Sequence, residues 1–337
     1  MTAPTPLLEA VAVTKCYNRR DGSVLSAVDG VSLSIDAAET VALVGETGSG
    51  KSTLARLALG LTAPDEGEIR FRGRPLDKMS SAEHHKFRLA VQPIFQDPGA
   101  SFNPRRKVKD LLRQAFVQAG RRRAEIPDAT EAVLTSVGLH VTPDFLQRYP
   151  HELSGGQRQR LAIARALAMA PDLLIADEPL SGADASIRGQ ILNLLSDLQE
   201  ERRIAILFIT HDISIARAFA HRVAVMYQGH VVEQGLAGDV LGHPQHPYTQ
   251  LLLAAAPSVT GHVDFSRFSS VASRQPAPGG CVFYSRCPIA TDACTAVQPA
   301  LTVVGPHGHR AACLAVEALV EGAAVEEAPL SAAANGK

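Results

Sequence analysis

Residues 45–53 have the types and spacing of a phosphate-binding loop. They read GETGSGKST and match the pattern G-x-x-x-x-G-K-[ST]. The glycines allow backbone N–H groups to wrap phosphates, Lys51 supplies positive charge at the β- and γ-phosphates, and Ser52 can ligate Mg²⁺. The motif has the context it requires, because an apolar run at 41–44 predicts a strand before it and LARLALGL predicts a helix after it.

A second stretch, residues 153–179, combines a possible anion-binding turn with a pair of carboxylates. It begins with LSGGQ, a glycine-rich turn that opens a predicted helix, and such a helix N-terminus suits an anion such as phosphate. It ends with an apolar run followed by Asp177 and Glu178. This run predicts a buried parallel strand that delivers two carboxylates to the C-terminal edge of a sheet, where open α/β sheets bind ligands.

Two more polar side chains follow apolar runs that are predicted as strands. Gln96 ends the run at 89–95, and His211 follows the run at 204–209. A glutamine at the end of a core strand can reach a metal or an attacking water, and His211 is expected at the same sheet edge as the carboxylates. Alone, one glutamine is a weak signal and one histidine is more often structural.

Together these motifs resemble the ABC-type ATPases. Residues 153–179 resemble the signature and Walker B region of that family, and the runs FQDPGASFNPR and HPYT resemble its oligopeptide/dipeptide importer subfamily. The resemblance covers about residues 7–315. It implies an α/β fold, namely an ABC-type P-loop ATPase with a RecA-like core, an antiparallel β subdomain and a helical insert at about 97–165.

The resemblance also implies a domain organisation. An ABC ATPase domain is expected at 1–255, a small C-terminal cysteine-rich extension at 256–320, and a disordered Ala/Glu-rich tail at 321–337.

The family's functional residues can be carried over to matching positions as expectations. Glu178 orients and polarises the attacking water, Gln96 and His211 sense the γ-phosphate, and Asp177, with Ser52 and Gln96, holds Mg²⁺. Tyr17 stacks on adenine, although a strand aromatic that packs on the core is as good an interpretation of that residue. The residues expected to contact ATP are Tyr17, Gly45, Gly48, Ser49, Gly50, Lys51, Ser52, Thr53, Ser154, Gly155, Gly156, Gln157 and Asp184. Asp184 closes LSGAD, which departs from the family's usual SALD at Gly182 and Ala183.

The chain has one set of ATPase motifs and no internal repeat. In the family, the signature turn of one subunit closes on the phosphate loop of another, so a second ABC ATPase subunit is expected, more readily a paralogue than an identical chain. Two membrane permease subunits and, indirectly, an extracytoplasmic solute-binding protein are the other expected partners. The implied function is ATP hydrolysis that powers peptide import. Nickel or glutathione as substrate, a soluble ABC ATPase of DNA repair or translation, and a metal-dependent redox sensor remain alternatives.

Composition limits the location and the partners. The 337 residues are 46% hydrophobic and carry a formal net charge of −1, which gives no support for nucleic-acid binding. No apolar run reaches the roughly 18 residues needed to span a bilayer, and the N-terminus lacks the features of a signal peptide. A cytosolic chain, bound peripherally to the cytoplasmic face of the membrane through partner proteins, is expected.

Four of the five cysteines cluster late, with the spacing C-x5-C-x6-C-x18-C. A cytosolic chain disfavours disulfides, and a zinc site usually shows paired short spacings that are absent here. Spacing alone leaves a metal site and buried unligated thiols equally open. Resemblance to the cysteine-rich C-terminus of peptide-importer ATPases favours an iron–sulfur cluster, [4Fe–4S]. Its expected ligands are Cys281, Cys287, Cys294 and Cys313.

Overall fold

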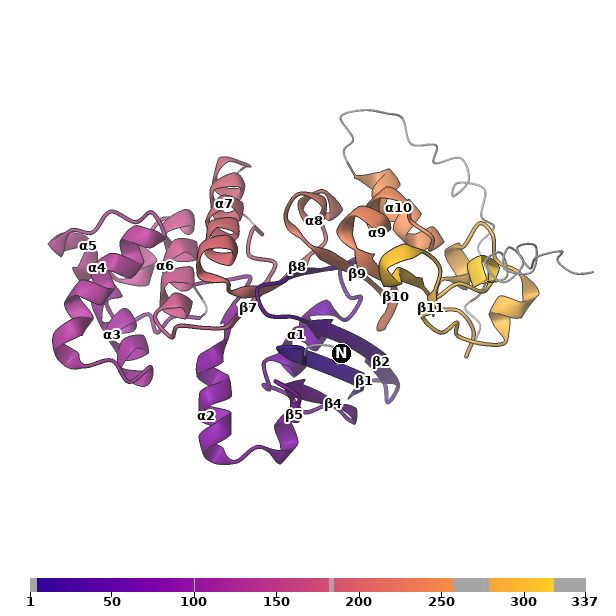
Figure 1. Cartoon of the computed structure of the whole chain (residues 1–337), viewed down its shortest axis with the longest axis horizontal. Coiled ribbons are helices and arrows are strands. Elements are labelled where there is room, and N and C mark those ends of the chain that lie inside the picture. The colour runs from indigo at the N-terminus through magenta and orange to yellow at the C-terminus, as the bar shows by residue number, and fades with distance from the viewer. Residues whose placement is uncertain (1–4, 100, 182–184, 257–274, 276–278, 318–337) are drawn as a thin grey trace, which may run out of the picture. The chain divides into compact units, whose positions relative to one another are not determined.

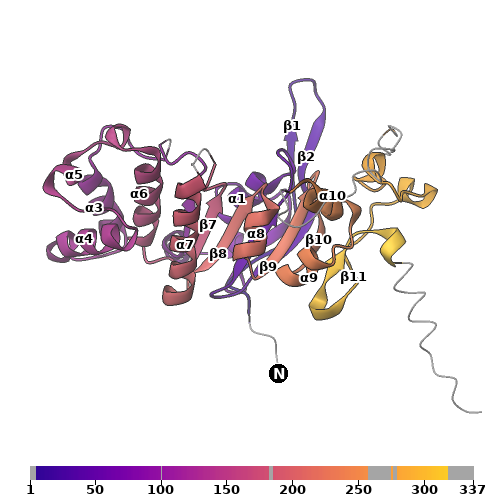
Figure 2. The ribbon, with the colours of Figure 1, turned by 90° about the horizontal axis from the view of Figure 1, so that it is seen from above.

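The computed structural model describes residues 5–99, 101–181, 185–256, 275 and 279–317. It divides into two compact units, Met1–His230 and Val231–Lys337, and Figures 1 and 2 show the ribbon from two perpendicular directions. The tail predicted to be disordered lies outside the described residues, and the predicted domain boundaries stay predictions.

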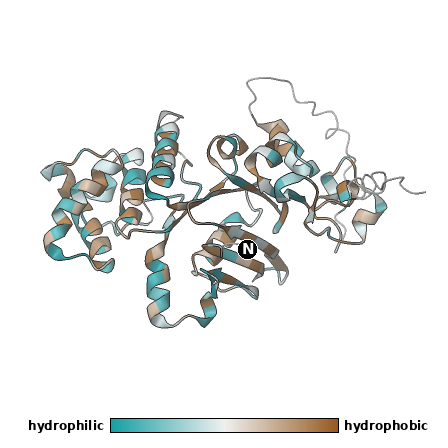
Figure 3. Cartoon of the chain, in the orientation of Figure 1, coloured by the Kyte–Doolittle hydropathy of each residue, from teal (hydrophilic) through white to brown (hydrophobic). Residues whose placement is uncertain are grey.

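Parallel strands form the centre of the first unit, in the order β9-β3-β8-β7-β6. Every residue of β3 and β8 is buried, as expected of parallel strands that are covered on both faces. Figure 3 shows these strands as mostly apolar. The strands are β3 (Thr40–Val44), β6 (Val91–Ile94), β7 (Leu173–Asp177), β8 (Ala205–Thr210) and β9 (Arg222–Tyr227).

The pairing register brings the carboxyl ends of these strands to one edge. Val44 pairs with Thr210, and Asp177 pairs with Ile209. Because the strands are parallel, the loops that leave β3, β6, β7 and β8 emerge together. These four loops carry the phosphate loop, Gln96, Glu178 and His211, so the sequence-based expectation that they share one edge is confirmed.

Helices cover both faces of this sheet. Figure 1 shows the sheet nearly edge-on, with α7 and α8 on one side and α1 on the other. The helix α2 begins with a capping box between Ser80 and Glu83. The helices are α1 (Lys51–Ala58), α2 (Ser81–Ala90), α7 (Ala185–Arg202) and α8 (Ile213–Phe219).

An antiparallel sheet with the order β2-β1-β4-β5 completes the nucleotide-facing side of the first unit. The strands β1 and β2 form a long hairpin in which Tyr17 pairs with Leu25. The strands are β1 (Leu8–Asn18), β2 (Val24–Ile35), β4 (Glu66–Phe71) and β5 (Arg74–Pro75). This sheet corresponds to the predicted antiparallel β subdomain.

A helical insert follows β6, as predicted. Its helices are amphipathic, and their apolar faces form one core that includes Phe102, Leu112, Leu134 and Leu161. The helices are α3 (Val108–Gln118), α4 (Ile126–Ser136), α5 (Pro143–Gln147) and α6 (Gly155–Leu167).

The second unit is built around a buried charge. Glu233 is 0% exposed. It accepts hydrogen bonds from the backbone N–H groups of Gln245 (2.8 Å) and His246 (2.9 Å), and it pairs with Nε2 of His309 (2.7 Å). These contacts compensate the cost of removing a carboxylate from water, and they hold the HPYT segment against the C-terminal extension. The elements are β10 (His230–Leu236), α9 (Ala237–Gly242), α10 (Pro247–Ala255), β11 (Thr302–Val303) and β12 (Arg310–Ala311).

Among the helices of the described residues, none combines the length and the apolar character that crossing a membrane requires.

Candidate active site

A pocket of about 370 Å³ opens where the antiparallel sheet faces the phosphate loop. Eight of the residues predicted for the ATP site line it. Three residues that the sequence reasoning missed, Leu25, Ala27 and Thr47, line it as well. The predicted residues among its lining are Tyr17, Gly48, Gly50, Lys51, Ser52, Thr53, Gln96 and Glu178.

Tyr17 lies in this pocket as an exposed side chain rather than in the core. It is 38% exposed, and its cross-strand neighbour Leu25 is 40% exposed. Two partly exposed apolar side chains at the mouth of a phosphate pocket form a surface on which a flat base can stack. This placement favours the adenine-binding interpretation of Tyr17 over the packing interpretation.

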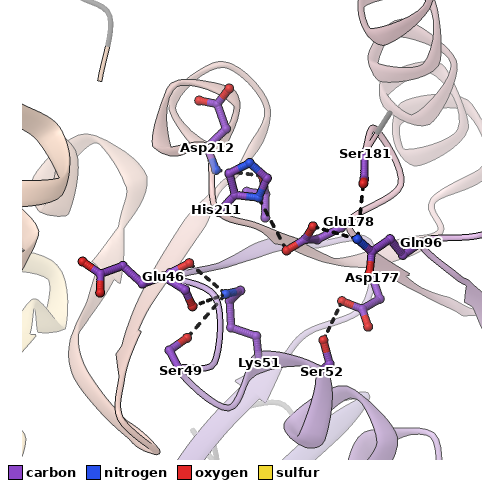
Figure 4. A network of polar contacts seen from close by, with 12 residues as sticks. Glu46, Ser49, Lys51, Ser52, Gln96, Asp177, Glu178, Ser181, His211 and Asp212 are labelled. Atoms are coloured by element: carbon purple, nitrogen blue, oxygen red, sulfur yellow. Dashed lines mark hydrogen bonds and ion pairs between the residues drawn. The ribbon is translucent and has the colours of Figure 1, made fainter. Parts of the chain in front are cut away.

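Lys51 closes the phosphate loop on itself. Its Nζ donates to the carbonyl oxygens of Gly45 and Glu46 (2.8 Å each) and to Oγ of Ser49 (3.4 Å) (Figure 4). Burial lowers the pKa of Lys51, while the nearby carboxylates, Glu178 first, raise it. The acceptors of the ammonium group are therefore uncharged oxygens of the loop. A phosphate that fits the loop would bind the ammonium group more strongly than these oxygens do.

Two glycines of the loop cannot be replaced without moving backbone. Gly50 has φ of 107°, and a Cβ built on it would lie 2.1 Å from the carbonyl oxygen of Ala27. A Cβ on Gly45 would lie 2.1 Å from the carbonyl oxygen of Met226. Gly45 and Ser49 are not among the residues that line the pocket, and their predicted contact with the nucleotide stays a prediction.

Asp177 and Ser52 face each other across the end of β7. Oγ of Ser52 donates to Oδ1 of Asp177 at 3.2 Å. Burial raises the pKa of Asp177, the hydrogen bond from Ser52 lowers it, and the neighbouring charge of Glu178 raises it. Mg²⁺ is usually bound by one or two carboxylates together with substrate phosphates. A hydroxyl and a carboxylate beside the phosphate loop fit that set of ligands.

Glu178 is the meeting point of the polar network in Figure 4. Its carboxylate accepts a hydrogen bond from Nε2 of Gln96 (3.3 Å) and lies 3.5 Å from Nδ1 of His211. Gln96 also donates to Oγ of Ser181 at 3.2 Å. The structure therefore brings Gln96, Glu178 and His211 together, as predicted, and adds Ser181.

The backbone of Glu178 is strained. Its φ of 45° lies in the left-handed region, which costs a non-glycine residue about 1–3 kcal/mol. Its N–H donates to the carbonyl of Ile209 (3.0 Å), and its own carbonyl accepts from the N–H of Ser181 (3.0 Å). These two bonds hold the carboxylate at the sheet edge, and strain of this kind is common at active sites.

The turn formed by Ser154, Gly155 and Gly156, called the signature turn below, lies in a different place. It lines a second cavity of about 690 Å³, together with Gln96 and Arg158. It does not line the pocket that contains Lys51. Gln96 borders both cavities, and α6 begins at the signature turn with no acidic residue in its first turn.

Gln157, which is predicted to contact ATP, makes two hydrogen bonds at the start of α6. Its Oε1 accepts from the N–H of Ser154 (3.0 Å), and its own N–H donates to Oγ of Ser154 (3.2 Å). This is a capping box, so the side chain fixes the start of α6. Asp184 was predicted to contact ATP, and it lies outside the described residues.

The structure gives no support to the predicted iron–sulfur cluster as a metal site. Among the residues that the structure describes, no group of three or more histidine, cysteine or acidic side chains is arranged to hold a metal ion. The four thiols nevertheless line one small cavity of the second unit, and they are not joined as disulfides. Its cysteine lining is Cys281, Cys287, Cys294 and Cys313.

A phosphate loop, a strand that ends in two carboxylates and a glycine-rich helix start, all on one α/β unit, define a P-loop ATPase. Comparison with known proteins agrees. Residues 28–181 match the ABC transporter family, and residues 232–294 match the oligopeptide/dipeptide transporter C-terminal region. The chain belongs to the ABC transporter family, and it is an ATPase of the group that carries this C-terminal region.

Individual relatives are similar over most of the chain. The oligopeptide transport ATP-binding protein AppF of Bacillus subtilis is 42% identical over 307 residues, which cover 88% of this chain and 91% of AppF. The solved structure of cbiO1 from Clostridium perfringens, part of the ABC transporter complex cbiONQ, has a TM-score of 0.61 at 32% identity and covers 71% of this chain and 92% of its own. The solved structure of the ATP-binding cassette MJ0796, a post-hydrolysis dimer bound to ADP and Pi, has a TM-score of 0.60 at 29% identity. The match covers 68% of this chain and 98% of the MJ0796 chain.

Lys51→Ala should weaken ATP binding by about 10- to 100-fold, because hydrogen bonds to charged groups contribute about 1.5–3 kcal/mol. The measurement is a titration of the isolated chain with a fluorescent ATP analogue. Lys109→Ala removes an exposed lysine of α3 and is the matched control. Equal affinities for the Lys51→Ala and Lys109→Ala chains would show that Lys51 does not bind phosphate.

Proposed function

We propose that this chain is the ATP-hydrolysing subunit that powers the import of peptides across the cytoplasmic membrane. The observation that carries the proposal is the division of the ATP machinery between two cavities of one chain. The phosphate loop lines one cavity and the signature turn lines the other. The peptide class is supported by the matched C-terminal region and by the name of AppF, an oligopeptide transport ATP-binding protein.

The positions of the side chains support specific roles in hydrolysis. Asp177 and Ser52, with Gln96, would hold Mg²⁺, which neutralises charge that develops on the phosphates. Glu178 would orient and polarise the attacking water. His211 would contact the γ-phosphate, because its side chain is 61% exposed and lies beside that carboxylate.

The two cavities support a site shared between two chains. ATP held by Lys51 would meet the signature turn of a second ABC ATPase subunit, which we propose is a paralogue rather than an identical chain. Hydrolysis would remove the phosphate that bridges the two subunits, so the pair would open. Two membrane permease subunits, fed by an extracytoplasmic solute-binding protein, would use this movement, and the chain would sit peripherally on the cytoplasmic face of the membrane.

Ser154→Arg tests whether the signature turn acts on the nucleotide of another chain. The substitution places bulk and charge at an exposed turn, outside the pocket that contains Lys51. We expect ATP hydrolysis by the assembled transporter to be abolished, while the isolated chain binds ATP with unchanged affinity. Asn193→Arg adds the same side chain at an exposed position of α7 and should change neither quantity. Loss of ATP binding by the isolated Ser154→Arg chain would show that the turn acts within its own chain.

We further infer that the second unit holds a [4Fe–4S] cluster on Cys281, Cys287, Cys294 and Cys313. Four thiols on one cavity are the number and type of ligand that such a cluster takes. A zinc site usually shows paired short C-x2–4-C spacings, and this chain lacks them. When bound, the cluster would supply a redox-active or structural centre.

Burial raises the pKa of Cys287 to about 11, and burial also raises the pKa values of Cys281 and Cys313. A bound cluster would have to displace these protons, because metals bind the thiolate form.

His246 lines this cavity as well. It is 2% exposed, and burial lowers its pKa to about 3, so the ring is neutral. Its Nδ1 accepts from the N–H of Tyr248 at 3.1 Å, so the ring proton is on Nε2.

Cys287→Ser tests the cluster. Anaerobically purified protein should be brown and should contain iron and acid-labile sulfide, and this colour should be lost in the Cys287→Ser chain. Cys16→Ser, which removes the one cysteine outside the cavity, should keep it. Colourless parent protein, with stoichiometric zinc or with no metal at all, would contradict the assignment.

A further inference from the structure

Basic residues are concentrated in one short segment of the helical insert. Residues 105–123 hold eight of the chain's 33 lysines and arginines and one acidic residue, Asp110. The chain as a whole has a formal net charge of −1, so the positive surplus of this segment is balanced by acidic residues elsewhere. A charge distribution of this kind attracts an anionic surface to one side of the molecule although the net charge is negative.

The helix α3 presents part of this charge on its solvent-facing side. Lys109, Arg113 and Val117 follow one another at intervals of four residues, so they lie along one line of the helix surface, and all three are exposed. The side chain of Val117 is 51% exposed. Figure 1 shows α3 at the periphery of the insert. The other side of α3 is buried in the core of the insert, and its buried residues are Val108, Leu111, Leu112, Ala115 and Phe116.

Four exposed cations of the segment have no carboxylate partner. Within the part of the chain that the structure describes, none of them forms a salt bridge, whereas Arg121 and Arg122 of the same segment both pair with Glu125. The four unpaired charges therefore do not hold the fold together. They are called the basic cluster below and are Arg105, Arg106, Lys109 and Arg113.

The stability of α3 does not explain the basic cluster either. Arg105 and Arg106 lie in the turn that leads into α3, and Lys109 lies in its first turn. The helix dipole favours anions at this end of a helix and cations at the other end, yet the last turn of α3 has no basic residue. Because the cations lie where they weaken the helix, an anionic partner outside the chain is the better explanation of their positions.

We propose that the basic cluster binds the anionic headgroups of the lipid membrane. This contact rests on the proposed location at the cytoplasmic face of the membrane, and it adds a direct attachment to the one through permease subunits. Clusters of about four to eight lysines and arginines are attracted to the negative surface of a cytoplasmic leaflet. The exposed Val117, one helical turn from Arg113, suits the boundary between headgroups and acyl chains, which accepts apolar side chains.

A nucleic acid fits the basic cluster less well than a lipid surface does. Surfaces that bind single strands combine cations with aromatic side chains on which the bases stack. The one aromatic residue of segment 105–123 is Phe116, and it is 4% exposed, so it offers no stacking surface. Anionic lipids need no such surface, because their attraction for cations is electrostatic and requires no fixed geometry.

The test is flotation of the full chain with vesicles of equal parts phosphatidylglycerol and phosphatidylcholine, and with vesicles of phosphatidylcholine alone. The chain should bind only the anionic vesicles, and added salt should weaken the binding because it screens exposed charges. Lys109→Gln combined with Arg113→Gln should lower the affinity about 25-fold, since each cation near an anionic membrane contributes about fivefold.

The matched control is Lys86→Gln combined with Arg88→Gln. It removes the same charge from exposed positions of α2 and should leave the affinity for anionic vesicles unchanged. Both double variants should bind ATP as the parent does, which shows that they fold. An equal loss of vesicle binding in the two double variants would show that only the net charge matters, and this would overturn the proposal.

Three further results would contradict a lipid contact. The parent chain could fail to bind anionic vesicles, or it could bind only vesicles that carry the permease subunits, which would assign the basic cluster to a protein. Tighter binding to single-stranded RNA than to anionic vesicles, lost with Lys109→Gln and Arg113→Gln, would assign the cluster to nucleic acid. None of these results bears on ATP hydrolysis, because flotation contains no nucleotide. Conversely, a chain that binds the vesicles but hydrolyses no ATP in the assembled transporter would contradict the proposed function alone.

Discussion

The site depends on one constraint. Both faces of the central sheet are buried, so polar side chains can reach solvent or a ligand only at the ends of its strands. The strands β3 and β8 are buried throughout, and the groups that can do chemistry are gathered at their carboxyl edge. There Lys51, Asp177 and Glu178 lie close enough to influence one another's charge, and burial disfavours the charged forms of Lys51 and Asp177. Such a cluster is incomplete without ligands. A triphosphate would compensate the lysine, and Mg²⁺ would compensate the carboxylates.

The same sheet edge is where nucleotide binding can be coupled to a conformational change. Gln96 borders both the nucleotide pocket and the cavity of the signature turn, and its amide contacts Glu178. In the proposed mechanism, a nucleotide replaces that contact with a different one. A ligand shifts a conformational equilibrium only by its differential affinity for the two states, and we propose that this exchange of partners is the step at which binding energy enters the helical insert.

The parts of the site that the sequence predicted are those encoded by short motifs and apolar runs. The phosphate loop, Asp177, Glu178, Gln96 and His211 each follow a predicted strand, so their meeting at one edge follows from parallel pairing alone. Leu25 was missed because its place beside Tyr17 depends on the register of a hairpin with several irregularities. Such an irregular strand register cannot be predicted from the alternation of apolar and polar residues in the sequence.

The capping role of Gln157 could have been predicted from the sequence, although the signature motif drew attention to a different role. Ser154 and Gln157 have the spacing of a capping box, and the structure shows that capping box at the start of α6. The strained backbone of Glu178 had no signal, because a glutamate with positive φ is imposed by its tertiary hydrogen bonds. The cysteine spacing left a metal site and unligated thiols equally open, and the family resemblance favoured a shared site. The structure gathers the four thiols on one cavity, and no group in the described part of the chain is arranged to hold a metal ion.

The most direct test of this account is a single-turnover measurement of ATP hydrolysis by the assembled transporter with Glu178→Gln. The substitution keeps the shape of the side chain and removes the charge that, in the proposed mechanism, orients water. ATP should bind as in the parent, hydrolysis should slow by about 100- to 10,000-fold, and the two ATPase subunits should stay closed on the trapped nucleotide. Hydrolysis at the parental rate would show that the carboxylate at this sheet edge does not drive the reaction.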